Sequence, residues 1–206
     1  AVRRRAGTEP ALLVDLGAGS GSSFRALAPL IPGPQDWRLV EHDPALLGFQ
    51  AAEIAQWARG QGHRASLGSG LAIVTAGADE WRAHSVAHDL ASGLDALPLS
   101  TAHGVTASAL LDLVSEPWLA RLSMRLAATG IPFLAALTVD GRRAWQPAHR
   151  DDTLIDGLFA RHQLGDKGFG AALGPAAPEA AQTLFRGRGY TVASMASEWR
   201  LEPGAD

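Results

Sequence analysis

The chain has 206 residues, of which 47% are hydrophobic, and its 18 Lys and Arg against 21 Asp and Glu give a formal net charge of -3. This size favours one domain, residues 1–206, with a large buried core. The slightly acidic balance argues against nucleic-acid binding, because a protein that neutralises many phosphates normally presents a basic face. The absence of Cys excludes disulfides and cysteine-ligated zinc.

No apolar run approaches the roughly 20 residues that cross a bilayer, so we expect no membrane association and, by default, a cytoplasmic location. The basic run Arg3, Arg4 and Arg5 at the start of the chain favours a solvated tail over a nucleic-acid arm.

Apolar runs and helical patterns alternate along the chain. The predicted strands are Ala11–Leu16, 37–40, 71–75, 81–87, Gly104–Ser108, 132–139 and 190–196. The predicted helices run from Ser22 or Ser23 to the prolines that start at Pro29, from the Asp43-Pro44 cap to Gly60, and over 118–128, 151–163 and 178–186. We expect the helix over 118–128 to bury Leu119, Leu122 and Leu126, and the helix over 151–163 to bury Leu154, Leu158 and Phe159. This alternation predicts an α/β fold with a mostly parallel sheet, and the two stretches 71–75 and 81–87 can form a hairpin or an extra edge strand.

The loop after the first predicted strand is the main candidate for a ligand site. Residues 11–22 read ALLVDLGAGSGS, an apolar strand that ends beside Asp15 and passes into a loop with glycine at every second position. Parallel sheets bind ligands in the crevice beyond the carboxyl ends of their strands. A P-loop needs Lys and then Ser or Thr after its last glycine, and a dinucleotide loop needs a third glycine where this chain has Ser22 or Phe24. Because Asp15 would repel a pyrophosphate and attract a cation, the loop favours a cationic ligand without phosphates.

This segment resembles the first motif of the class I S-adenosylmethionine-dependent methyltransferases, in which an acidic residue stands two places before G-x-G-x-G. Glu41 stands where that family has an acidic residue that accepts both ribose hydroxyls, and Glu41-His42-Asp43-Pro44 resembles the second motif. His88-Asp89-Leu90 falls where a third-strand Asp commonly meets the adenine amino group. The resemblance covers roughly residues 12–140 and implies a Rossmann-like sheet with helices on both faces and S-adenosylmethionine as the cofactor, with S-adenosylhomocysteine as its product.

The resemblance also implies a set of cofactor-binding residues. They are Asp15, Gly17, Ala18, Gly19, Glu41, His42, Asp89, Leu90 and Ser108. Each has a structural alternative: the glycines can form a tight turn, Asp15 or Asp89 can cap the next helix or turn, and Glu41 can be a surface residue at a strand end.

The sequence departs from the family in two places. His103 and Gly104 stand where the fourth strand of the family often opens with Asp. After 190–196, only the short stretch 199–201 could contribute to the family's seventh strand. We therefore expect a sheet that lacks a complete seventh strand, in a chain that ends before the sheet is complete.

Methyl transfer is an in-line displacement at an activated carbon and needs no fixed set of catalytic side chains, so the sequence identifies no catalytic residue. Ser108, Ala109 and Asp112 follow the fourth core strand and are candidates to line the methyl-donor site. For Asp112 and Glu116, solvated positions before a helix are the favoured alternative.

A second polar cluster lies between the fifth and sixth predicted strands. It comprises His162, Gln163, Asp166 and Lys167. This region often helps to form the acceptor pocket, and His162 can act as a substrate-side base or, as we favour, interact with the helix dipole. The histidines are scattered singly, so no metal site is predicted.

Methyl transfer to a small-molecule acceptor is the leading hypothesis. Two alternatives stay open: an NAD-dependent oxidoreductase, which the missing third glycine disfavours, and a non-catalytic S-adenosylmethionine-binding protein. The acceptor and the oligomeric state cannot be inferred from the sequence.

Overall fold

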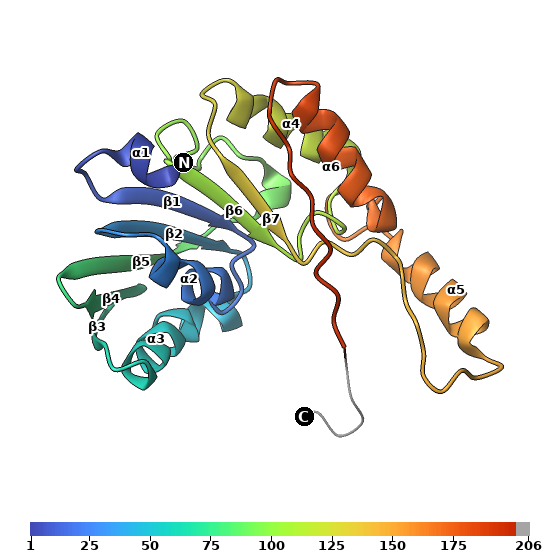
Figure 1. The fold of residues 1–206 in the computed structure, drawn as a ribbon, viewed down its shortest axis with the longest axis horizontal. Helices are drawn as coiled ribbons and strands as arrows, with labels where there is room; N and C mark the ends of the chain where they lie inside the picture. The colour runs from blue at the N-terminus through green and yellow to red at the C-terminus, as the bar shows by residue number, and fades with distance from the viewer. Residues whose placement is uncertain (201–206) are drawn as a thin grey trace.

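The computed structural model describes residues 1–200, and its centre is one seven-stranded sheet with the order β3-β4-β5-β2-β1-β6-β7 (Figure 1). The strands are β1 (Ala11–Leu16), β2 (Gln35–Glu41), β3 (Arg64–Gly68), β4 (Leu71–Ala76), β5 (Asp79–Ala87), β6 (Gly104–Ser108) and β7 (Phe133–Ala136). The helices are α1 (Val2–Ala6), α2 (Ser22–Leu27), α3 (Pro44–Gly60), α4 (Glu116–Ala127), α5 (Asp152–Gln163) and α6 (Ala177–Arg186). Three short 3-10 turns complete the order: η1 (Ala28–Leu30), η2 (Leu90–Ser92) and η3 (Gly174–Ala176).

The sheet is mostly parallel. Strands β1, β2, β5, β6 and β7 pair in parallel, whereas β3 and β4 form an antiparallel hairpin that pairs with β5. The predicted α/β class with a mostly parallel sheet is confirmed. In the part of the chain that the structure describes, no helix has the length and apolar character needed to cross a membrane.

Helices cover both faces of the sheet, because successive strand residues point to opposite sides. Leu13 of β1 packs in one core cluster with Phe24 of α2 and Ile54 of α3. Its neighbour Val14 packs in the other cluster, together with Leu122 of α4. The predicted inward residues of α4 are confirmed, since Leu119, Leu122 and Leu126 are all fully buried.

The order of the strands creates a switch point beside β1. From β1 the chain moves to β2 and later to β5 on one side, and it then returns to β6 on the other side of β1. At such a point an open α/β sheet forms a crevice beyond the carboxyl ends of its strands. The glycine loop after β1 and the residues after β6 both lie at this edge.

Several predicted boundaries differ from the observed ones. The strands Ala11–Leu16 and Gly104–Ser108 and the helix from Pro44 to Gly60 are confirmed as predicted. The strand predicted over 132–139 is shorter, because Leu137 has a φ of 52°, outside the extended region. Strand β3 was not predicted, because its residues are nearly all exposed and show no apolar alternation.

The prediction of a strand over 190–196 is wrong, since these residues form no strand in the structure. The Tyr190 hydroxyl donates a hydrogen bond to the Ile131 carbonyl at 2.7 Å, and its ring packs edge-on against Phe185 at 5.1 Å. Tyr190 thus packs through its side chain against the residue that precedes β7 by two positions and against α6, and these contacts are not the ladder of backbone hydrogen bonds that a strand requires. Trp199 and Arg200 form no strand either, and residue 201 lies outside the described residues.

Helix α5 forms where predicted, but the prediction of its buried side is wrong. Leu154, Leu158 and Phe159 are 60%, 48% and 49% exposed. The side of α5 that meets the rest of the chain is polar: Arg143 donates to Gln163 Oε1 at 2.9 Å and pairs with Asp156 at 3.6 Å. These polar contacts orient the helix with its apolar side outward.

The interpretation of the first arginines as a solvated tail is also wrong for two of the three. They belong to α1, and Arg5 donates to the carbonyls of Thr129 and Gly130 after α4, at 3.0 and 3.2 Å. Arg3 donates to the Pro34 carbonyl at 3.3 Å. These two arginines join the start of the chain to the base of the sheet.

Candidate functional site

The loop after β1 and the segment after β2 meet at the carboxyl edge of the sheet. The Ala18 amide donates to the Val40 carbonyl at 2.8 Å, and the His88 amide after β5 donates to the Glu41 carbonyl at 2.9 Å. On the other side of β1, the amide of Ala109, which follows β6, donates to the carbonyl of Ala136 in β7 at 3.1 Å. The ends of the five parallel strands are therefore held together as one edge.

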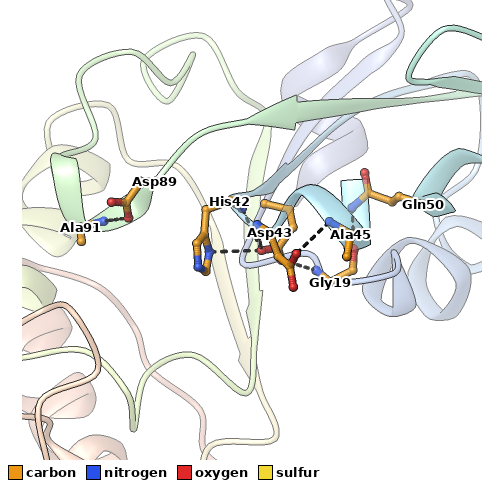
Figure 2. Close-up of polar contacts among 8 residues, drawn as sticks. Gly19, His42, Asp43, Ala45, Gln50, Asp89 and Ala91 are labelled. Atoms are coloured by element: carbon orange, nitrogen blue, oxygen red, sulfur yellow. Dashed lines mark hydrogen bonds and ion pairs between the residues drawn. The ribbon is translucent and has the colours of Figure 1, made fainter. Parts of the chain in front are cut away.

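Glu41 is the centre of this edge. Its side chain is buried, with 6% exposed, and its Oε2 accepts a hydrogen bond from the Gly19 amide at 3.0 Å (Figure 2). Its Oε1 accepts from the amides of His42 and Asp43 at 2.8 and 3.0 Å, and His42 Nδ1 lies 3.2 Å away. The structure thus brings together the two predicted residues Gly19 and Glu41, which are separated by 22 positions in the chain.

Gln50 of α3 holds the same glycine from its other side. Its Nε2 donates to the Gly19 carbonyl at 2.6 Å, and the side chain is fully buried (Figure 2). Its Oε1 has no hydrogen-bond partner in the described part of the chain. Gln50 was not among the predicted site residues, although a polar residue between the apolar positions of a predicted helix is a signal that could have identified it.

The glycines of the loop differ in what surrounds them. A Cβ on Gly21, with a φ of 85°, would lie 2.9 Å from Ile54 Cδ1, so this position needs glycine for packing. A Cβ on Gly19, with a φ of 56°, would meet no atom within 4 Å. The backbone at Gly19 is therefore open to close approach by a ligand.

Asp15 lies beneath the loop and has no exposed surface. Its Oδ1 accepts from the Thr106 hydroxyl of β6 at 2.7 Å, and its Oδ2 has no partner among the described residues. Burial raises the pKa of Asp15 to about 7, against the opposing effect of the hydroxyls of Thr106 and Ser23. Asp15 joins β1 to β6 from within the core and makes no surface available to a ligand in this conformation.

The remaining predicted residues on the β2 and β5 side have separate roles. The His42 side chain is exposed, and Figure 2 shows it between Asp43 and the turn that contains Asp89. Asp89 caps η2, where its carboxylate accepts from the Ala91 amide at 2.8 Å, so the cap that we left open as its alternative is present. Leu90 is a core residue whose carbonyl accepts from Trp118 Nε1 at 2.9 Å.

The β6 side of the switch point carries two strained residues and one buried carboxyl. Ala109 and Leu137, which follow β6 and β7, have φ values of 51° and 52°, and such strain in residues with a side chain concentrates at functional sites. Ser108 is half-buried. Asp112 is buried, with 7% exposed, and its burial raises the pKa of this carboxyl. The alternative of a solvated position is therefore wrong for Asp112, whereas Glu116 is exposed.

The second predicted cluster is held by its own loop. Lys167 Nζ donates to the His162 carbonyl at 3.1 Å and lies 3.4 Å from His162 Nε2. Asp166 accepts from the amides of Gly168 and Gly170 at 2.7 and 2.9 Å. Gln163 is buried against Arg143. Within residues 1–200, none of the hydrogen bonds of this cluster joins it to Glu41 or to the glycine loop.

Two cavities lie away from the glycine loop. One of about 110 Å³ is lined by Pro10, Gln35 and Arg82, and the other, of about 300 Å³, by Glu116, Glu179 and Leu184. Among residues 1–200, no three His, Asp or Glu side chains gather closely enough to bind a metal ion.

No protein-family model matches this chain, and no curated protein matches it. Its function is therefore inferred from the residues at the carboxyl edge themselves.

Proposed function

We propose that this protein binds S-adenosylmethionine at the carboxyl edge of β1 and β2 and transfers its methyl group to a small-molecule acceptor. The observation that carries the proposal is the hydrogen bond between the buried Glu41 carboxylate and the Gly19 amide. Loops that bind nucleotide phosphates offer free backbone amides to an anion. Here a carboxylate already occupies that amide, which favours a ligand with hydroxyl groups and positive charge but without phosphates.

The hydrogen-bonding capacity of Glu41 is compatible with a ribose. Oε1 accepts from two backbone amides, whereas Oε2 accepts from Gly19 alone among residues 1–200 and keeps capacity for a hydroxyl. Gly19 also leaves room for a ligand beside the backbone. Glu41 would therefore hold the ribose, and the loop of Gly17, Ala18 and Gly19 would lie against the rest of the cofactor.

Bound S-adenosylmethionine would supply a methyl group on a positively charged sulfur, so the main task of the chain is to position the acceptor in line with it. Ser108 and Ala109 would line the methyl side, because Ser108 ends β6 at the switch point and Ala109 follows it. Asp112 lies in the same loop, and its raised pKa moves this carboxyl toward the neutral form. We assign no general base.

A non-catalytic S-adenosylmethionine-binding protein is the second candidate. Neither of the two cavities described above is lined by residues of the glycine loop, and no catalytic side chain is assigned at the edge. Calorimetry with S-adenosylhomocysteine and NAD tests the cofactor. Incubation with methyl-labelled cofactor and a metabolite extract then tests catalysis, because binding without any labelled product would support the second candidate.

A further inference from the structure

Helix α5 projects from the body of the molecule, and Figure 1 shows it beyond α6, away from the sheet. Of its 12 residues, Gln163 is the one that is buried. We define the outer stripe as Leu154, Ile155, Leu158 and Phe159, whose side chains are 60%, 46%, 48% and 49% exposed. Spacings of one, four and five residues place these four side chains on one side of the helix.

A surface helix normally buries its apolar side against the protein and exposes its polar side, and α5 does the reverse. The chain covers the polar side of α5 through Arg143, which contacts Asp156 and Gln163. Arg143 also lies over the Phe159 ring at 4.1 Å from its centroid, which covers part of one member of the stripe. Contiguous exposed apolar residues of this kind mark interaction sites, and a helix of this length is marginal in water without packing.

The charges at the two ends of the stripe indicate what covers it. Asp151 lies four residues before Ile155, and His162 lies four residues after Leu158, so both continue the same side of the helix. Arg161 adds a second basic group at the C-terminal end. Asp151 is exposed and lies 3.5 and 3.8 Å from its exposed neighbours His149 and Arg150. The stripe is thus acidic at its start, apolar in its middle and basic at its end.

This pattern is complementary to itself in the antiparallel orientation. A second copy of α5 turned by a two-fold axis would place apolar side chains against apolar side chains. Asp151 of each copy would then face Arg161 and His162 of the other, which is the reciprocal arrangement of an isologous interface. We propose that the outer stripe is a dimerisation surface through which two copies of this chain pair α5 antiparallel. The proposal is independent of the cofactor.

The mass of the protein in solution tests the dimer. Sedimentation velocity over a range of concentrations should show a species of twice 21.5 kDa that dissociates on dilution. The Leu158→Lys variant should remain monomeric at every concentration and stay folded by circular dichroism, because the replaced side chain is 48% exposed. Thr153→Lys, at an exposed position of α5 outside the stripe, is the matched control and should dimerise like the wild type. A wild type that stays monomeric throughout, or a Leu158→Lys variant that dimerises as well as the control, would overturn the proposal.

Cross-linking tests the orientation, and it is direct because the chain contains no cysteine. An equal mixture of the Asp151→Cys and His162→Cys variants should form disulfide-linked dimers under mild oxidation, whereas either variant alone should form few. Efficient cross-linking of each variant alone, without mixed dimers, would show a parallel arrangement and contradict the proposal.

Discussion

The Gly19 amide donates a hydrogen bond to Glu41 Oε2 at 3.0 Å, and this contact joins the glycine loop after β1 to the end of β2. With the amides of His42 and Asp43 at Oε1, three backbone donors converge on one buried carboxylate. Glu41 therefore has a structural role in addition to the ribose contact that we propose.

Glu41→Gln should lower the stability of the protein. The amide keeps one acceptor oxygen and turns an NH2 group toward backbone donors, so we expect the free energy of unfolding to fall by about 1–3 kcal/mol. Urea denaturation measures this change. Asp89→Asn is the control, because Asn caps a turn about as well as Asp and this residue is exposed. Equal stability of the two variants would show that the Glu41 contacts contribute little.

Gly19→Ala should weaken ligand binding, whereas Gly62→Ala, with a similar effect on stability, should leave binding unchanged. Both Gly19 and Gly62 have positive φ, 56° and 80°, and open space around the missing Cβ, so alanine at either should cost about 1–2 kcal/mol of stability. At Gly19 the new methyl group should also weaken binding of S-adenosylhomocysteine by at least about tenfold, equivalent to 1.4 kcal/mol. Calorimetry on the two folded variants measures this difference, and equal affinities would place the ligand elsewhere.

Asp15 should make the protein less stable as the pH rises. Its pKa is about 7 in the folded chain, against an ordinary value of 3.8 that applies to the unfolded chain, so between these values the folded state binds more protons. The free energy of unfolding should therefore fall between about pH 4 and pH 7, and Asp15→Asn should remove that part of the decline. We expect the variant to exceed the wild type at pH 8 by an amount on the order of a few kcal/mol.

Thr106→Val is the matched test for the Asp15 prediction. It removes the hydroxyl that stabilises the ionised carboxylate, so the pKa of Asp15 should rise further and the decline in stability should extend to higher pH. The difference in free energy of unfolding between the wild type and Asp15→Asn should change between pH 4 and pH 7. A difference that stays constant over this range would contradict this account.

His103, in contrast to Asp15, should make the protein more stable as the pH rises. Its Nδ1 accepts from the Leu12 amide at 2.9 Å, a contact that requires the neutral ring, and burial followed by the charges of Arg5 and Arg3 lowers the pKa of His103 below 6.5. Its contribution should be present above pH 6.5 and be lost as the pH falls through the folded-state pKa. His103→Ala should cost about 1 kcal/mol at pH 8 and less at pH 4.5. Urea denaturation of the wild type and of His103→Ala at the two pH values measures the difference in their free energies of unfolding. A difference that grows on acidification would refute this prediction.

Local patterns in the sequence were sufficient for most of the sheet. The buried run at Ala11–Leu16 and the cap at Asp43 predicted elements with the observed boundaries, because apolar continuity and capping chemistry act over a few residues. The prediction of a strand over 190–196 failed because a strand needs a partner strand as well as an apolar pattern, and Tyr190 contacts Ile131 and Phe185 through its side chain instead. The same limit applies to α5, whose period was visible but whose orientation depends on Arg143.

The candidate site was predictable in part. The resemblance of two segments to methyltransferase motifs predicted that Gly19 and Glu41 belong to one site, and the structure brings these two residues into contact. The partners Gln50 and Thr106 were missed, since each comes from a distant element and has no motif of its own. The role expected of Asp15 depended on its exposure to a cation, and exposure is a property of the packed core that spacing alone does not determine.

Isothermal titration calorimetry of the whole chain with S-adenosylhomocysteine and, separately, with NAD tests the central claim most directly. We predict saturable binding of S-adenosylhomocysteine at one site, and no binding of NAD, because the Glu41 carboxylate occupies the Gly19 amide that a pyrophosphate would need. Binding of NAD without binding of S-adenosylhomocysteine would contradict it.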